Sequence, residues 1–284
     1  MKTVERYYHP ADLSAALAAA AGDPGAVWLA GGTSLFAGDY ADKPAAVIDI
    51  STFIPRGVAA KGSELSVGAG TTFQELIDSE LVPAVLKDAA LGIGSRNVRN
   101  RATVGGNIAA DRACSSLIPS LLVLDAKLEI AEVRSPASSG VRPLDLRSWL
   151  DKPEGLILAI SFPVPDKSRR SAYGRWARTA VDAAVLGAAL CCSVEKGLLK
   201  DVRIALGGIS GKSRRMRELE ARLEGWRLPA PSDDPRAGIE AAALPLLAPA
   251  EGGIVSASFK RLRGAALLAD VVAAAIGGMK EGPR

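Results

Sequence analysis

Two glycine doublets offer the clearest chemistry in this sequence. The first, at 31–34, reads Gly-Gly-Thr-Ser, and the second, at 105–107, reads Gly-Gly-Asn. Glycine lacks a Cβ and tolerates positive φ, so backbone N–H groups can converge on an anion, and a pyrophosphate is the usual dianion that needs this approach. Each doublet taken singly is also explained by a tight turn, because the chain has 29 glycines. The two doublets together favour an anion site.

Histidine and cysteine are too scarce for several familiar kinds of active site. The chain has one histidine, His9, and three cysteines, Cys114, Cys191 and Cys192. A Ser-His-Asp triad or a histidine zinc site would depend on that one histidine, and no cysteine spacing matches zinc or an iron-sulfur cluster. We expect His9 to be solvated or hydrogen-bonded and Cys191 and Cys192 to pack in a core. We predict no catalytic side chain and no metal site.

Three further segments that contain glycine resemble nucleotide-binding motifs, but each lacks a glycine that its motif requires. The segment 207–213 would need a glycine at 206 to complete a P-loop, and Leu206 stands there. The segments 68–73 and 92–97 both lack the third glycine of the Gly-x-Gly-x-x-Gly fingerprint. We therefore expect neither a P-loop nor a Rossmann site.

The charge of the chain is nearly balanced, with 35 basic and 31 acidic residues and a net charge of +4. Basic stretches at 95–101, 166–178 and 211–217 could each hold a phosphate or face a nucleic acid. Solvated loops are the commoner explanation, and too few aromatic residues accompany them for base stacking. We expect no nucleic-acid partner.

The lengths of the apolar segments and the number of cysteines indicate the cellular compartment of the protein. No window is long and apolar enough to span a membrane, and the first residues lack the apolar core of a signal peptide. The three cysteines offer no disulfide framework. The sequence therefore predicts a cytoplasmic protein without a membrane span.

Strands and helices are expected on both sides of the first doublet. An amphipathic helix should follow Asp12, and residues 26–30 and 45–50 are typical of short buried strands flanking the glycine loop. A third strand is expected at 64–69. A helix capped by Thr71 or Thr72 should then follow, with Glu75 at the capping-box position relative to Thr72.

Around the second doublet, helices are expected at 81–92 and 115–125 and a strand at 126–133, and the doublet itself should form a loop. A segment rich in proline, serine and glycine, 135–143, predicts a loop or hairpin.

The pattern changes after residue 150. Strand-like runs follow one another without long helices between them, which indicates an antiparallel sheet, at 155–163, 171–178, 183–194 and 199–209. Helices are then expected at 213–224, 236–247 and 258–277. We predict an α+β protein of two domains, residues 1–165 and 166–284.

Several motifs in this order resemble the FAD-binding medium subunits of the molybdenum hydroxylases, the family of xanthine dehydrogenase and carbon monoxide dehydrogenase. The similarity extends over nearly the whole chain. It begins with an aromatic-x-x-Pro segment before a helix, Tyr-Tyr-His-Pro at 7–10, and a strand that leads into Ala-Gly-Gly-Thr at 30–33. The second signature is Arg-Asn-Arg-Ala-Thr-Val-Gly-Gly-Asn at 99–107. The strands and last helix of the second half are similar to the second domain of the family.

The resemblance implies cofactor-binding residues. In the family the first loop wraps the FAD pyrophosphate, the second faces it, and a few residues elsewhere approach the cofactor. Carried over to this sequence, these residues are Leu29, Ala30, Gly31, Gly32, Thr33, Ser34, Leu35, Ile93, Thr103, Gly105, Gly106, Asn107, Ser116 and Leu158. Ser116 stands where many members have an aspartate, and its hydroxyl brings neither a negative charge nor two acceptor oxygens.

The function implied by the resemblance is electron transfer. FAD in this subunit would receive electrons from an iron-sulfur subunit, after a molybdenum-cofactor subunit has oxidised the substrate, and pass them to NAD or oxygen. We expect a partner surface around the second doublet and Arg96, Arg99 and Arg101. The alternative is a degenerate scaffold or assembly subunit that binds little or no FAD.

Overall fold

The computed structural model of the protein describes residues 4–36, 44–132, 140–164, 166, 168–179, 182–228, 234–251 and 255–277. Most of the loop or hairpin expected at 135–143 lies outside these residues. Contacts divide the chain into two compact units. The first comprises Met1–Val82, Ser95–Ala110 and Ala126–Pro163, and the second comprises Pro83–Gly94, Asp111–Asp125 and Val164–Arg284.

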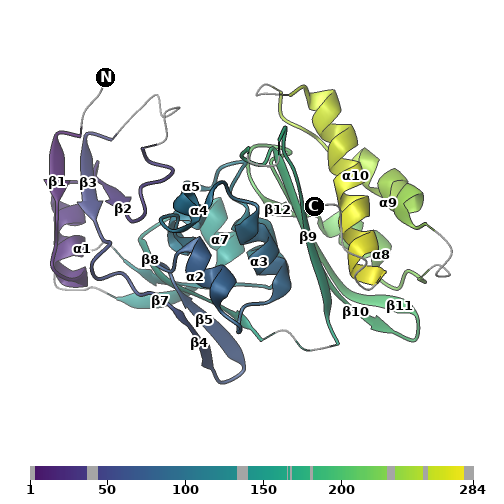
Figure 1. The fold of residues 1–284 in the computed structure, drawn as a ribbon, viewed down its shortest axis with the longest axis horizontal. Helices are drawn as coiled ribbons and strands as arrows, with labels where there is room; N and C mark the ends of the chain where they lie inside the picture. The colour runs from purple at the N-terminus through teal and green to yellow at the C-terminus, as the bar shows by residue number, and fades with distance from the viewer. Residues whose placement is uncertain are drawn as a thin grey trace. The chain divides into compact units, whose positions relative to one another are not determined.

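The first unit contains a small parallel sheet. Its strands are β1 (Arg6–Tyr8), β2 (Val27–Leu29) and β3 (Ala46–Asp49), in the order β1-β3-β2. Helix α1 (Leu13–Gly22) lies beside this sheet (Figure 1) and begins at Asp12, whose carboxylate accepts a hydrogen bond from Ala15 N at 2.8 Å. Leu29 pairs with Asp49, so β2 and β3 end at the same edge of the sheet. The chain enters the first glycine doublet from this edge.

The first unit also contains a five-stranded antiparallel sheet in the order β4-β5-β8-β6-β7. The strands are β4 (Val58–Lys61), β5 (Glu64–Gly68), β6 (Lys127–Ala131), β7 (Val141–Asp145) and β8 (Leu156–Pro163). Four helices belong to the same unit: α2 (Phe73–Asp78), α4 (Arg96–Arg99), α5 (Val104–Ala110) and α7 (Leu146–Asp151). The capping box predicted from Thr72 and Glu75 is confirmed at the start of α2.

The second unit is built on the four-stranded antiparallel sheet β12-β11-β10-β9. Its strands are β9 (Arg170–Trp176), β10 (Leu186–Glu195), β11 (Leu198–Gly207) and β12 (Arg214–Arg215). The helices are α3 (Ala84–Leu91), α6 (Leu117–Val123), α8 (Arg217–Leu223), α9 (Arg236–Ala243) and α10 (Ala257–Ile276), with a 3₁₀ turn η1 at Leu244–Leu246. Figure 1 shows α9 beside α10, which packs on β9 and β10. This arrangement confirms the predicted α+β class with an antiparallel sheet and helices in the second half.

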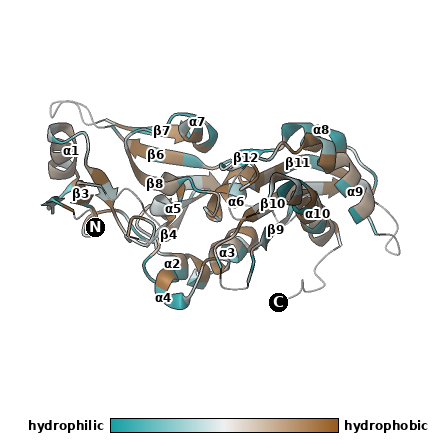
Figure 2. Ribbon diagram, turned by 90° about the horizontal axis from the view of Figure 1, so that it is seen from above, coloured by the Kyte–Doolittle hydropathy of each residue, from teal (hydrophilic) through white to brown (hydrophobic). Residues whose placement is uncertain are grey.

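The core of the second unit explains two sequence features. Cys191 and Cys192 are 2% and 0% exposed, which confirms that they pack in the core, and burial raises the pKa of Cys192 to about 11. The segment 207–213 is the end of β11 and the turn after it, as expected for an incomplete P-loop. Hydrophobic residues run along α6 in Figure 2, and all seven residues of this helix are buried.

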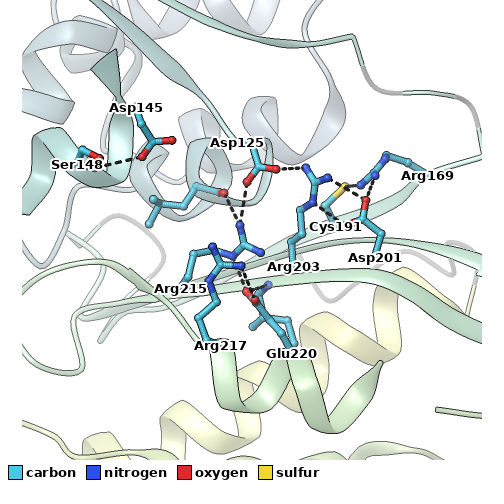
Figure 3. A network of polar contacts seen from close by, with 12 residues as sticks. Asp125, Asp145, Ser148, Arg169, Cys191, Asp201, Arg203, Arg215, Arg217 and Glu220 are labelled. Carbon is cyan, nitrogen blue, oxygen red and sulfur yellow. Dashed lines mark hydrogen bonds and ion pairs between the residues drawn. The ribbon is translucent and has the colours of Figure 1, made fainter. Parts of the chain in front are cut away.

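A network of ion pairs joins α6 to the sheet and helix α8 within the second unit (Figure 3). Asp125, just after α6, lies 2.5 Å from Arg203 Nη1 and 2.9 Å from Arg215 Nη1. Arg215 Nε donates to Glu220 Oε1 at 2.5 Å, and the same oxygen accepts from Ile204 N at 2.9 Å. The side chains of Arg215 and Glu220 are only 6% and 8% exposed, so their ion pair is largely shielded from water, and Asp125 is a second partner of Arg215.

Some elements were not expected from the sequence. The strands β1 and β4 and the helix α7 are additions, and the loop expected at the second doublet is instead helical, because Gly105 and Gly106 lie in the first turn of α5. Among the residues that the structure describes, no helix is both long and apolar enough to cross a membrane.

Candidate cofactor-binding site

The first glycine doublet forms a turn whose backbone donors are not used by the described part of the chain. Gly32 has φ +70°, a conformation that favours glycine, and Phe36 N donates to Gly32 O at 3.0 Å to close the turn. Among the described residues, the backbone N–H groups of 31–35 have no hydrogen-bond acceptor. All five residues are partly exposed. Such a row of donors can bind an anion, which is the chemistry predicted for this loop.

The turn borders a hollow of about 190 Å³ within the first unit. Its lining brings together residues from the first loop, from the segment after β3 and from the start of α2 and α5. These residues are Ala30, Gly31, Ser51, Ile54, Arg56, Gly70, Thr72, Asn100, Arg101 and Thr103. The described residues of the lining include two guanidinium groups and no carboxylate, so the hollow favours an anionic ligand.

The second doublet does not offer its N–H groups to a ligand. Gly105 N donates to Ala69 O at 2.8 Å, Gly106 N donates to Thr103 Oγ1 at 3.2 Å, and Asn107 N donates to Thr103 O at 2.9 Å. The expectation of a second bare-backbone loop is therefore wrong. The reason is that these N–H groups are bonded within the first unit.

Close packing explains why glycines occur at these two positions. A Cβ on Gly105 would lie 2.7 Å from Ala69 Cβ, and a Cβ on Gly106 would lie 2.7 Å from Thr103 Oγ1. Ala69 N donates in turn to Leu158 O at 2.9 Å. The doublet thus lets α5 sit directly against the end of β5, next to β8, and this places Thr103 at the hollow.

Two of the predicted site residues belong to the second unit, unlike both glycine doublets. Ile93 follows α3 and is partly buried, with its N–H donating to Ala90 O at 3.2 Å. Ser116 precedes α6 and is 3% exposed, and its hydroxyl has no hydrogen-bond partner among the described residues. The cofactor contacts implied by the resemblance for these two residues stay predictions.

The structure also adds residues that the sequence did not assign to the site. Ser51, Arg56 and Asn100 line the hollow, and so does Arg101, which we expected on a partner surface. Arg101 stands two residues before Thr103 in the second signature, so its proximity to the site could have been foreseen. The position of Arg56 could not, because it depends on the packing of 55–57 against Gly68 and Gly70.

The hollow suits binding better than acid-base chemistry. Among the described residues of its lining, the charged side chains are Arg56 and Arg101, and a guanidinium group offers hydrogen-bond donors but no acceptor. Among the described residues, no group of three or more His, Cys, Asp or Glu side chains could hold a metal ion. The arrangement can orient an anionic ligand through backbone N–H groups, guanidinium groups and the hydroxyl of Thr103.

Comparison with known protein families gives two matches that together span most of the chain. Residues 2–165 match the FAD binding domain in molybdopterin dehydrogenase, and residues 171–275 match the CO dehydrogenase flavoprotein C-terminal domain. The chain therefore belongs to the family of FAD-binding subunits of molybdopterin dehydrogenases.

Individual relatives agree with this assignment. The chain is 31% identical over 218 residues to the putative xanthine dehydrogenase FAD-binding subunit XdhB of Escherichia coli K12, covering 71% of this chain and 73% of XdhB. It is 28% identical over 233 residues to the nicotine 6-hydroxylase medium subunit of Paenarthrobacter nicotinovorans, covering 78% and 81%. A solved carbon monoxide dehydrogenase chain from Hydrogenophaga pseudoflava superposes with a TM-score of 0.84 at 26% identity, covering 97% of this chain and 98% of that one.

The geometry of the first glycine loop fits FAD, the cofactor of this family. A dinucleotide carries a pyrophosphate, and the first loop presents N–H donors that the described part of the chain leaves unused. A Cβ at Gly31 would lie 1.8 Å from Arg101 O, so only glycine permits the loop to approach the second signature this closely.

Proposed function

We propose that this chain is the FAD-binding subunit of a molybdenum hydroxylase complex and passes electrons from the iron-sulfur clusters of a partner to NAD or oxygen. The observation that carries the proposal is the row of N–H donors at 31–35, which no described residue accepts from, beside a hollow whose described lining has two guanidinium groups and no carboxylate. When bound, FAD supplies the ability to accept electrons singly and release them as a pair.

The residues of this chain bind and orient. The N–H groups of 31–35 hold the pyrophosphate, and Thr103, held by its bond to Gly106 N, lines the hollow beside it. Gly105, Asn107 and Leu158 support that wall by packing and hydrogen bonding. Ile93 and Ser116 are further cofactor contacts that the family resemblance implies.

The proposal includes two partners, an iron-sulfur subunit and a molybdenum-cofactor subunit. Relatives named as FAD-binding or medium subunits support it. Arg96 and Arg99 in α4 are the residues that we expect to face a partner. We also propose that the FAD-binding domain comprises residues 1–165 and the C-terminal domain residues 166–284, which the family matches over 2–165 and 171–275 support. A cytoplasmic location stays a prediction.

The first experiment is the visible absorption spectrum of the purified full chain, before and after incubation with FAD, followed by release and identification of the cofactor. We expect a flavin spectrum and one FAD per chain. A colourless chain that takes up no added FAD would overturn the proposal in favour of the scaffold alternative.

A pair of glycine variants tests the loop. Gly32 and Gly62 have φ +70° and +62°, so alanine strains the backbone similarly at both positions. A Cβ at Gly32 also meets Phe36 and Leu29 at 3.2 and 3.3 Å, whereas nothing lies within 4 Å of one at Gly62. We expect Gly32→Ala to weaken FAD binding about tenfold and Gly62→Ala to leave it unchanged. Equal affinities in the two variants would remove the first loop from the site.

The electron acceptor needs its own measurement. Anaerobic addition of NADH to the FAD-loaded chain should bleach the visible flavin band if NAD is the acceptor, because hydride transfer is reversible. If NADH leaves the band unchanged and oxygen rapidly restores it after chemical reduction, the acceptor is oxygen. A reduced flavin that neither NAD nor oxygen reoxidises would contradict both choices.

A further inference from the structure

Arg101 is turned toward the first glycine loop. Its Nε donates to Gly31 O at 3.3 Å, and its own carbonyl oxygen lies 1.8 Å from where a Cβ on Gly31 would be. These contacts hold the carbonyl group and the Nε atom of Arg101 next to the loop. The terminal Nη1 and Nη2 atoms have no acceptor among the described residues, and no carboxylate there forms an ion pair with them. The side chain is therefore a cation that none of the described carboxylates neutralises.

Arg56 is the second cation in the lining, and it is partly neutralised. Its Nη2 lies 3.4 Å from Glu75 Oε1, while Glu75 Oε2 accepts from Thr72 N at 2.7 Å in the capping box of α2. Glu75 therefore both positions Arg56 and cancels part of its charge. Of the two guanidinium groups, Arg101 has the larger uncompensated charge within the described part of the chain.

We infer that Arg101 binds the diphosphate of the nucleotide in this hollow and that Arg56 contributes a weaker second contact. This inference rests on the proposed FAD site and adds the side chains that supply its positive charge. A guanidinium fork offers two parallel donors that match two phosphate oxygens, whereas backbone N–H groups contribute only partial charges. A diphosphate next to 31–35 would then meet both kinds of donor, and a nucleoside without phosphates would gain nothing from Arg101.

The test compares FAD and ADP binding to the full chain, with FAD followed by flavin fluorescence and ADP by competition. ADP carries the diphosphate without the flavin. The variants are Arg101→Gln, Arg101→Lys and Arg56→Gln, with Arg96→Gln as the matched control because Arg96 lies in α4 and does not line the hollow. Each titration is repeated at low and high salt, and thermal unfolding checks that every variant is folded.

We expect Arg101→Gln to raise the Kd for FAD and for ADP about tenfold or more, and Arg56→Gln to raise both about threefold. Lysine at 101 should restore part of the affinity, because it returns the charge without the fork. The control should stay within about twofold. The wild-type Kd should also rise more steeply with salt than that of Arg101→Gln, since only the wild type has this phosphate contact to screen.

Three outcomes would overturn the inference, and they differ in whether the proposed function also fails. If Arg101→Gln binds FAD as tightly as the wild type while Gly32→Ala loses it, the inference fails and the proposed function stands. If Arg101→Gln weakens binding but the salt dependence and ADP competition are unchanged, Arg101 only positions the loop. If the wild-type chain binds neither FAD nor ADP, the proposed function fails and the inference fails with it.

Discussion

The carbonyl oxygen of Arg101 occupies the space that a side chain at Gly31 would need, because a Cβ built on Gly31 would lie 1.8 Å from this oxygen. The first glycine loop and the second signature are therefore in direct backbone contact within the first unit. The first doublet permits this contact and leaves its N–H groups without a described acceptor, whereas the second doublet allows helix α5 to pack closely.

Replacing Gly31 by alanine should force the loop away from Arg101, since a backbone carbonyl cannot rotate aside as a side chain can. We expect Gly31→Ala to lower the free energy of unfolding by about 1–3 kcal/mol and to weaken FAD binding. Urea unfolding and flavin titration measure the two effects. Gly22→Ala is the control, because a Cβ there meets nothing within 4 Å. Wild-type stability and affinity in Gly31→Ala would contradict the contact.

Substitutions of Thr103 test the structural role of the second doublet. Its Oγ1 accepts the N–H of Gly106 at 3.2 Å, and the residue is only 8% exposed. Thr103→Val keeps the shape but leaves that N–H without an acceptor, so we expect a loss of about 1 kcal/mol in the free energy of unfolding. Thr103→Ser keeps the acceptor and should lose less. If valine and serine gave the same stability, the hydrogen bond would contribute nothing.

Glu220 tests the buried ion network of the second unit. Glu220→Ala would remove one of the two carboxylates that pair with Arg215, which is 6% exposed, and the acceptor of Ile204 N. We expect the free energy of unfolding to fall by about 1–3 kcal/mol, because Ile204 N loses its acceptor while Asp125 still pairs with Arg215. Glu218→Ala, at an exposed position of the same helix, should cost less than about 1 kcal/mol. Equal losses of the two variants in chemical denaturation would contradict a stabilising role of the buried contacts of Glu220.

Asp201 should make stability depend on pH in the acid range. Burial raises the pKa of its carboxyl, but hydrogen bonds from Arg203 and Arg169 outweigh burial and hold the pKa below the ordinary value of 3.8. A lowered pKa in the folded state means that the carboxylate stabilises the fold above pH 3.8, and that this contribution is lost as the pH falls through the folded-state pKa.

The variant Asp201→Asn should accordingly be less stable than the wild type at neutral pH, and the difference should disappear below pH 3.8. Asparagine also tolerates the left-handed backbone at this position, where φ is +45°. Unfolding at a series of pH values measures the difference. Glu195→Gln, an exposed change in the neighbouring strand, is the control. A stability difference that stayed constant with pH would contradict the role of the carboxylate.

Much of the fold could be predicted because its signals are local. The caps at Asp12 and at Thr72 with Glu75 define helix starts through bonds to residues three positions away, and both occur as expected. Strand patterns placed β2, β3, β5 and β8 to within a few residues. The short strands β1 and β4 were missed, because three or four residues are too few to show a clear alternation.

The sequence by itself determined the family and the first glycine loop, because the spacing and types of the motif residues carry both. Only the tertiary structure decided what each doublet does. The N–H of Gly105 is bonded to Ala69, and the guanidinium of Arg101 is turned toward Gly31, and both partners are distant in the sequence. A hydrogen bond between distant segments leaves no local sequence pattern. The sequence could therefore indicate which groups are possible donors, but not which of them are hydrogen-bonded within the folded protein.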